Sequence, residues 1–261
     1  MSKEILDKLQ SPSTATLTSI LKLHGLSNTY MQGVKPLQPG MCMAGPAYTL
    51  RYIPAREDLD SAEVDNLTDP QRVGIEELSE GEVFVIDARG VTSAGTMGNI
   101  LATRIHVRGG VGIVTDGAYR DSPAISEIGI PAYAVAMNAH SNKTVHHPSE
   151  IQVPIACGGV AVFPGDIIVG DSEGVVVIPP ILQKRLPNRP RLWKIGRISL
   201  SNGYVRVPAL SAITPQTKRR YPSLKNGSGT VNKIRLPALR HQKHLRYLQV
   251  YSEQFWFGSD R

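Results

Sequence analysis

Short apolar runs separated by glycine, aspartate and proline dominate the first two thirds of the chain. Their lengths and their valine and isoleucine content are typical of buried strands, and AGPAYTLRYI (44–53) alternates as a half-buried strand would. The predicted buried strands are VFVID (83–87), VGIVTD (111–116), AYAVAM (132–137), VAVF (160–163), DIIVG (166–170) and VVVIP (175–179).

Two segments instead repeat their apolar residues with helical spacing. SPSTATLTSILKLHGL (11–26) has serine and threonine cap candidates and ends at a glycine, and Ile100, Leu101, Ile105 and Val107 share one face of a helix that stops before Gly109. The second helix lies between two predicted strands, and little room for helices is left after residue 132. We therefore predict an α/β fold, a single layered β/β/α domain of the swivelling-domain kind.

Charge divides the chain in two. Residues 1–183 hold 12 basic and 20 acidic residues, a net −8, whereas residues 184–261 hold 17 basic and 2 acidic ones, a net +15. The apolar pattern also fades after residue 182, apart from RISLSNGYVRV (197–207), which could form a hairpin around Asn202 and Gly203. We predict a domain over 1–183 and an irregular basic extension over 184–261.

Composition narrows the cellular setting. Two cysteines are too few for a disulfide scaffold in 261 residues, and the first residues, MSKEILDKLQ, lack the apolar stretch of a signal peptide. No run of about 18 apolar residues could span a membrane. These features predict a cytoplasmic protein without a membrane partner.

Two segments carry candidate chemistry. VTDGAYRDSPAI places Asp116, Arg120 and Asp121 directly after a predicted strand, where α/β proteins commonly bind ligands; alternatively, Asp116 only stabilises a turn and the other two are solvated. In SAGTMGNILATR, a glycine precedes a predicted helix whose free N–H groups could bind a carboxylate or phosphate, although a simple turn explains the same pattern.

Other polar clusters favour structural roles. His146, His147 and Glu150 look like metal ligands, but Pro148 argues against the helix of an H-E-x-x-H site, so we expect a capped loop there. Aspartate and glutamate in the PGDIIVGDSEG block are expected to stabilise turns; they are Asp166, Asp171 and Glu173.

Taken together, the ordered blocks resemble a known family. GNIL (98–101), GVGIVTDGAYRDS (110–122) and FPGDIIVGDSEGVVVIP (163–179) are similar to successive blocks of the family of the regulator of ribonuclease E activity A and the 4-hydroxy-4-methyl-2-oxoglutarate aldolases. The resemblance covers roughly residues 10–182.

The resemblance implies a class II pyruvate aldolase site that uses a divalent metal, Mg²⁺ or Mn²⁺. Backbone N–H groups of the glycine turn would hold the carboxylate of a 2-oxo acid, Arg120 would contact the pyruvyl oxygens, and Asp121 would hold the metal largely through waters. The turn residues are Gly98, Asn99, Ile100 and Leu101. The expected reaction is retro-aldol cleavage of a 4-hydroxy-2-oxo acid, with oxaloacetate decarboxylation as a side activity; a water, which Asp116 could orient, would carry the proton.

Lysine placement supports the metal-dependent class. The alternative aldolase chemistry needs a lysine Schiff base, and no lysine occurs between Lys35 and Lys143, the stretch that contains both site segments. The resemblance also implies a homotrimer or a dimer of trimers with the site between subunits. A different interpretation is a non-catalytic regulator that binds a ribonuclease or another protein, since the family includes one.

The extension departs from the family, which normally continues into an acidic or mixed helical tail that packs on a neighbouring subunit. Residues 184–261 hold only Glu253 and Asp260 as carboxylates. They could be a native tail that binds RNA or another polyanion through basic and aromatic residues, or a stretch translated in an altered reading frame, which we favour because the change is abrupt.

Overall fold

The computed structural model describes residues 3–60, 65–182, 199–201, 204–206 and 233–235. The chain divides into two compact units, Met1–Gly196 and Arg197–Arg261, which are described separately. In the described parts, no helix is both long and apolar enough to cross a membrane.

The first unit is built on an eight-stranded mixed sheet. Its order is β1-β7-β5-β3-β2-β12-β13, with β9 also paired to β2; β2, β3, β5 and β7 are parallel, and the β12–β13 hairpin is antiparallel to β2. The strands are β1 (Lys35–Pro36), β2 (Met43–Pro54), β3 (Val83–Asp87), β5 (Gly112–Thr115), β7 (Ala132–Ala134), β9 (His146–Ile151), β12 (Ile167–Asp171) and β13 (Gly174–Ile178).

Three strands of this sheet continue into a second, smaller one. After a short connection, β3 is followed by β4, β5 by β6 and β7 by β8. These three following strands form a parallel sheet of order β4-β6-β8. These strands are β4 (Gly95–Met97), β6 (Ala118–Tyr119) and β8 (Ala136–Met137). A separate hairpin is formed by β10 (Ile155–Cys157) and β11 (Val160–Val162).

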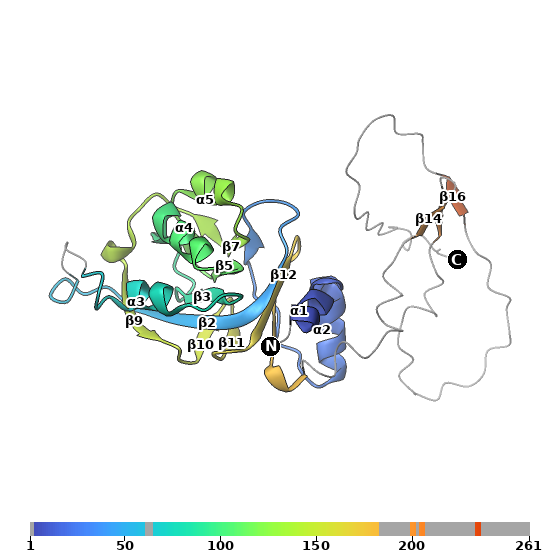
Figure 1. Ribbon diagram of the computed structural model, residues 1–261, viewed down its shortest axis with the longest axis horizontal. Coiled ribbons are helices and arrows are strands. Elements are labelled where there is room, and N and C mark those ends of the chain that lie inside the picture. Colours follow the sequence, from blue (N-terminus) through green and yellow to red (C-terminus); the bar gives the residue numbers. More distant parts are fainter. Residues whose placement is uncertain (1–2, 61–64, 183–198, 202–203, 207–232, 236–261) are drawn as a thin grey trace, which may run out of the picture. The chain divides into compact units, whose positions relative to one another are not determined.

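Helices cover the sheet in layers. Figure 1 shows α4 and α5 on one side of β2 and β3, the β10–β11 hairpin on the other, and α1 and α2 beside β12. Side-chain caps begin two of them, from Ser13 in α2 and Asp69 in α3. The helices are α1 (Lys3–Gln10), α2 (Thr14–Leu23), α3 (Pro70–Glu77), α4 (Asn99–Val107) and α5 (Ser122–Ile128), with 3₁₀ turns η1 (Asn142–Thr144) and η2 (Pro180–Leu182).

Three apolar clusters hold these layers together. One lies between the sheet and helices α3 to α5 and includes Phe84, Ile105 and Ile125; a second lies under the β10–β11 hairpin around Val85 and Val160; a third joins the N-terminal helices to the β12–β13 hairpin. Burial of this apolar surface is the main favourable term in folding. The predicted β/β/α layering is confirmed.

The apolar runs predict the main strands closely. VFVID coincides with β3, the runs at 111–116 and 160–163 contain β5 and β11, and the runs at 166–170 and 175–179 match β12 and β13 to within one residue at each end. Three expectations are wrong. Residues 146–151 form strand β9 where a loop was expected, because residues 50–54 of the long β2 extend beyond its pairing with β12 and need backbone partners. The run at 132–137 is divided between β7 and β8, which belong to different sheets, and Ile100 and Val107 of the predicted apolar helix face are exposed.

In the second unit, the described residues form three short strands. β14 (Ser199–Ser201) pairs antiparallel with β15 (Tyr204–Arg206), which pairs with β16 (Lys233–Arg235). β14 and β15 are the two strands of the predicted hairpin. Its turn residues, Asn202 and Gly203, and the rest of the basic extension lie outside the described residues, so the polyanion and reading-frame interpretations stay predictions.

Candidate active site

At the carboxyl edge of the small sheet, the residues that follow its three strands lie next to one another. Gly98 follows β4, Arg120 follows β6 and Asn138 follows β8. The backbone N–H of Arg120 donates to the carbonyl of Met97 at 3.0 Å, and that of Asn138 donates to Tyr119 at 2.9 Å. Because the carboxyl ends of parallel strands meet at one edge, the two sequence segments predicted to form the site are neighbours.

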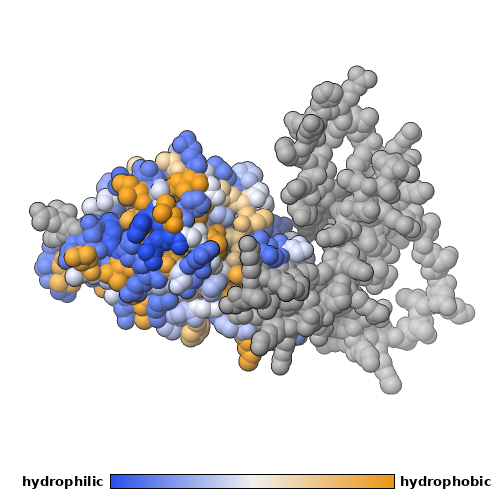
Figure 2. Space-filling model, in the orientation of Figure 1, coloured by the Kyte–Doolittle hydropathy of each residue, from blue (hydrophilic) through white to orange (hydrophobic). Residues whose placement is uncertain are grey.

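Gly98 is also the N-cap of α4, and no side chain caps this helix. The N–H groups of its first turn, at Asn99, Ile100 and Leu101, therefore have no partner inside the helix. Such a turn favours negative charge, because of its free donors and the helix dipole. Figure 2 shows apolar and hydrophilic side chains next to one another on the face that carries α4, whose Ile100 has an exposed fraction of 79%.

Arg120 and Asp121 lie directly against Gly98. A Cβ atom built on this glycine would be 2.6 Å from Oδ2 of Asp121 and 3.2 Å from Cγ of Arg120. Nε of Arg120 is 3.4 Å from the same carboxylate oxygen, is buried, and has no hydrogen-bond partner among the described residues. The structure thus brings together a cation, a carboxylate and the start of a helix.

Asp121 has an unusual backbone and an open carboxylate. Its φ is +54°, in the left-handed region, where it precedes the first residue of α5. Aspartate tolerates this region better than most residues. The side chain is 41% exposed, and its polar contact among the described residues is the ion pair with Nε of Arg120 at 3.4 Å. A partly exposed carboxylate with this single contact has acceptor capacity left for a ligand.

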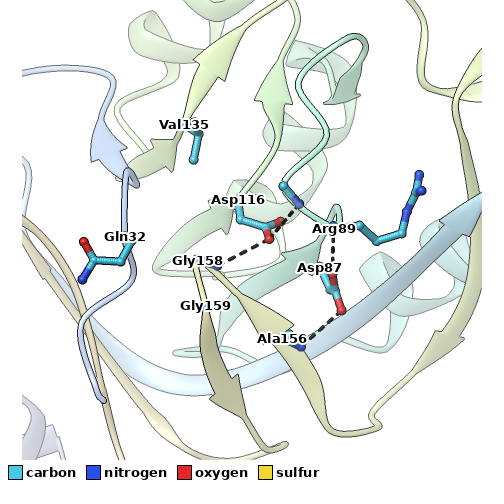
Figure 3. Close-up of a pocket in the computed structure, with 9 residues that line it drawn as sticks. Gln32, Asp87, Arg89, Asp116, Val135, Ala156, Gly158 and Gly159 are labelled. Carbon is cyan, nitrogen blue, oxygen red and sulfur yellow. Dashed lines mark hydrogen bonds between the residues drawn. The ribbon is translucent and has the colours of Figure 1, made fainter. Parts of the chain in front are cut away.

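Asp116 lies elsewhere, at a cavity of 490 Å³ where the main sheet breaks off. Its carboxylate accepts hydrogen bonds from the N–H groups of Ala88 at 2.7 Å, Gly90 at 3.0 Å and Gly158 at 3.4 Å. Figure 3 shows it beside Asp87. Burial raises the pKa of Asp116, and the charge of Asp87 adds to this, while the three N–H donors act in the opposite direction.

Asp87 is held in the same manner and was missed from the sequence. It accepts from the N–H of Arg89 at 2.9 Å and of Ala156 at 3.2 Å. Its position at the end of a strand was the only signal available, and every acid at the end of a strand shares that signal. Both aspartates therefore stabilise loops, which for Asp116 is the second of its two predicted roles; among the described residues it makes no hydrogen bond to Arg120 or Asp121.

The Arg89 side chain points away from these two carboxylates (Figure 3). Its guanidinium contacts Nδ1 of His146 at 3.2 Å and the carbonyl of Val145 at 3.2 Å. His146 is fully buried and stacks on Tyr52 with ring centroids 5.1 Å apart. Burial, and then the charge of Arg89, lower its pKa to about 4, so the imidazole is neutral at pH 7.

Comparison with known proteins places this arrangement in a family. The family model described as "RraA-like: Aldolase/RraA" matches residues 4–177. The chain belongs to the RraA-like family.

Two curated relatives and one solved structure illustrate the RraA-like similarity. A Halalkalibacterium halodurans protein, provisionally named a 4-hydroxy-4-methyl-2-oxoglutarate aldolase, is 34% identical over 168 residues, which cover 64% of this chain and 72% of that protein. Protein DlpA of Legionella pneumophila is 32% identical over 176 residues, 67% of this chain but only 27% of DlpA.

A solved structure matches a similar share of the chain. The crystal structure of Streptomyces coelicolor RraAS2, described as an unusual member of the RNase ES inhibitor RraA protein family, is 31% identical, with a TM-score of 0.66. The match covers 73% of this chain and 91% of RraAS2. The RraA-like fold is therefore shared over nearly the whole of that relative.

The other acidic and histidine candidates have structural partners in this RraA-like chain. His147 pairs with Asp60 at 2.8 Å and Glu150 with Arg51 at 2.6 Å. The expected turn roles are confirmed for two of the three residues: Asp166 accepts from the N–H of Phe163, and Asp171 accepts from the N–H of Glu173 and from the backbone and hydroxyl of Thr14. For Glu173, the contacts in this turn come from its backbone, and a side-chain role stays a prediction.

A divalent metal would find one protein carboxylate at the candidate site. Within the described ranges, no group of three or more histidine, cysteine, aspartate or glutamate residues could hold an ion. Mg²⁺ usually keeps several waters and binds through one or two carboxylates, so the open carboxylate of Asp121 suits a hydrated Mg²⁺ or Mn²⁺ and does not suit a dehydrated ion such as structural Zn²⁺.

Proposed function

We propose that this RraA-like protein is a metal-dependent aldolase that releases pyruvate from a 4-hydroxy-2-oxo acid such as 4-hydroxy-4-methyl-2-oxoglutarate. The observation that carries the proposal is the contact between Gly98, Arg120 and Asp121 at the start of α4. The aldolase name of the Halalkalibacterium halodurans relative supports the reaction class.

The start of α4 supplies the substrate carboxylate site in this proposal. The first-turn N–H groups of Asn99, Ile100 and Leu101 donate to the carboxylate of the 2-oxo acid, and the absent side chain of Gly98 lets Arg120 and Asp121 lie against this turn. No side-chain cap competes for these donors.

Arg120 provides the fixed positive charge. Cleaving the carbon–carbon bond of a 4-hydroxy-2-oxo acid leaves the electron pair on the pyruvyl fragment as an enolate, whose oxygen becomes negative in the transition state. The planar guanidinium of Arg120 suits carboxylate and enolate oxygens, and its ion pair with Asp121, at 3.4 Å from Nε, keeps the positive charge beside the start of α4.

Asp121 would hold the divalent cation, Mg²⁺ or Mn²⁺. When bound, the ion would supply a second positive charge beside the 2-oxo acid. Asp121 fixes where that charge sits, because its backbone conformation and the neighbouring Gly98 set the direction of its carboxylate. A water near the site is our proposed proton carrier. That Asp116, whose oxygens accept three N–H donors from neighbouring loops, orients this water stays a prediction.

The test is pyruvate release from 4-hydroxy-4-methyl-2-oxoglutarate and from oxaloacetate by the full chain. It is measured with Mg²⁺ or Mn²⁺ and again after EDTA, alongside the Asp121→Asn variant. We expect metal-dependent release by the unmodified chain only. Absence of release from both substrates by a folded sample contradicts the proposal.

The similarity to RraAS2 favours one other function, a non-catalytic regulator that binds a ribonuclease. Such a protein would inhibit RNA cleavage by an RNase E-type enzyme equally well with and without Asp121→Asn and Arg120→Ala. Inhibition that survives both substitutions, together with no pyruvate release, would replace the aldolase proposal. Assembly into a homotrimer or hexamer stays a prediction, which light scattering would check.

A further inference from the structure

The aliphatic part of Arg120 runs along two glycines three residues apart. A Cβ on Gly95 would lie 2.7 Å from the backbone N, 2.9 Å from Cβ and 3.1 Å from Cγ of Arg120. A Cβ on Gly98 would lie 3.2 Å from its Cγ and 3.5 Å from its Cδ. The Cβ, Cγ and Cδ atoms of Arg120 thus lie where a side chain on Gly95 or Gly98 would be.

These two contacts determine where the side chain ends. Beyond Cδ, Nε lies 3.4 Å from the carboxylate of Asp121, at the N-terminus of α4. Neither glycine has a positive φ, so backbone conformation does not require glycine at either position. The close approach of Arg120 and Asp121 does require it, since real Cβ atoms essentially never come within 3.0 Å of other atoms as these would.

We propose that Gly95 and Gly98 form a channel for the stem of Arg120 and are positioning residues that aim its guanidinium at a 2-oxo acid carboxylate bound at the start of α4. The inference rests on the proposed function. It adds Gly95, which was not among the predicted site residues. It also gives Gly98 a role besides its N-cap position, because the missing side chain of Gly98 leaves space for the Asp121 carboxylate.

The channel predicts different costs at its two positions. A methyl on Gly95 meets the backbone of Arg120 and forces β6 or β4 to shift, whereas a methyl on Gly98 meets only side-chain atoms, which can rotate away. Gly98→Ala should therefore fold with an unchanged melting temperature and still lose the site, because Arg120 and Asp121 are both displaced.

The experiment compares Gly95→Ala and Gly98→Ala with the unmodified chain in two assays. Calorimetric titration of oxalate, a planar dianion similar to the pyruvate enolate, is done in Mg²⁺, and pyruvate release is measured as kcat/KM. Gly112→Ala is the matched control, since its added methyl crowds Met43 in the core under the sheet. We expect each channel variant to lose at least about tenfold in both assays and the control to lose less than about twofold.

A double-mutant cycle separates positioning from general damage. The cycle is done at Gly98, because Arg120→Ala removes the Cγ and Cδ atoms that a Gly98 methyl meets but keeps the backbone N and Cβ that a Gly95 methyl meets. If Gly98 acts through Arg120, then Gly98→Ala costs at least about tenfold in the unmodified chain and clearly less in a chain that already carries Arg120→Ala. Equal losses in both backgrounds, or full oxalate affinity in Gly98→Ala, would overturn the channel.

Two further results also test the proposal: a Gly95→Ala variant that does not fold, and an unmodified chain without activity. Should Gly95→Ala not fold, full oxalate affinity in Gly98→Ala overturns the proposal and a tenfold loss at unchanged melting temperature supports it. Should the unmodified chain neither bind oxalate nor release pyruvate, the proposed function fails and the channel with it; an active unmodified chain with active channel variants overturns the channel alone.

Discussion

Two acidic regions of this chain lie at the carboxyl ends of parallel strands, and they differ in how their carboxylates are used. At the break in the main sheet, Asp87 and Asp116 together accept five backbone N–H groups. At the edge of the small sheet, Asp121 accepts none from the described residues and lies beside a buried arginine nitrogen without a partner. Position at the end of a strand therefore does not distinguish the two regions, whereas the acceptor capacity left on their carboxylates does.

Removing the carboxylate of Asp121 should have the largest effect on turnover. Asparagine tolerates the left-handed backbone, so Asp121→Asn keeps the fold and loses the charge that would hold the metal. We expect metal-dependent pyruvate release to fall by at least about 100-fold with an unchanged melting temperature. Full activity in steady-state assays would remove Asp121 from the site.

Removing the carboxylate of Asp116 should affect stability instead. Asp116→Ala leaves three N–H groups without their acceptor at a buried position. At roughly 1 kcal/mol or more for each, we expect a loss of about 3 kcal/mol in the free energy of unfolding, measured by urea denaturation. A stable variant with low turnover would reverse the assignment of the two regions.

Acid should weaken the region around the cavity through His146, which holds Arg89. The pKa of His146 is about 4 in the folded chain and near 6.5 in the unfolded one, so the unfolded chain takes up the proton first. This contribution to stability is complete above pH 6.5, declines as the pH falls, and is lost by about pH 4, a total of about 3 kcal/mol.

The matched variant for this pH effect is His146→Phe, which can stack on Tyr52 and cannot take up a proton. Denaturation midpoints measured from pH 7 to pH 4 should fall less steeply in this variant than in the unmodified chain. Parallel curves would show that His146 does not cause the acid sensitivity.

Arg120→Ala should give the smallest of these effects, and it tests whether the carboxyl edge of the small sheet binds the substrate. Removing the guanidinium should lower kcat/KM for the 2-oxo acid at least about tenfold, which is roughly 1.4 kcal/mol of transition-state stabilisation. Stability should change little, because the side chain is 42% exposed and its Nε makes no hydrogen bond to the described residues. An unchanged kcat/KM would remove Arg120 from the site.

The sequence predicts the main sheet well and the small sheet poorly, for a physical reason. Long apolar runs such as 83–87 carry enough residues to show their period, whereas β6 and β8 are two residues each and have none. The helix α5 has Pro123 in its first turn, where a turn without a helix is equally plausible from sequence.

For the site, only the resemblance to the family predicts that GNIL and the Arg120–Asp121 pair belong to one site. The pattern of residues in each segment does not predict it. The contact with Gly98 depends on how β4 and β6 pair, which no local pattern encodes. The same holds for Asp116, whose partner Gly158 is 42 residues away in sequence.

The break between the two sheets also constrains how chain length can vary among relatives. Only Asp116 and Gly117 join β5 to β6, whereas residues 88–94 join β3 to β4. Because strand side chains alternate between faces, deleting one residue at 116–117 would turn Arg120 to the opposite face of the small sheet. Insertions should therefore accumulate in the longer connection and be excluded from the shorter one, which makes spacing, more than residue identity, the heritable signature of this edge.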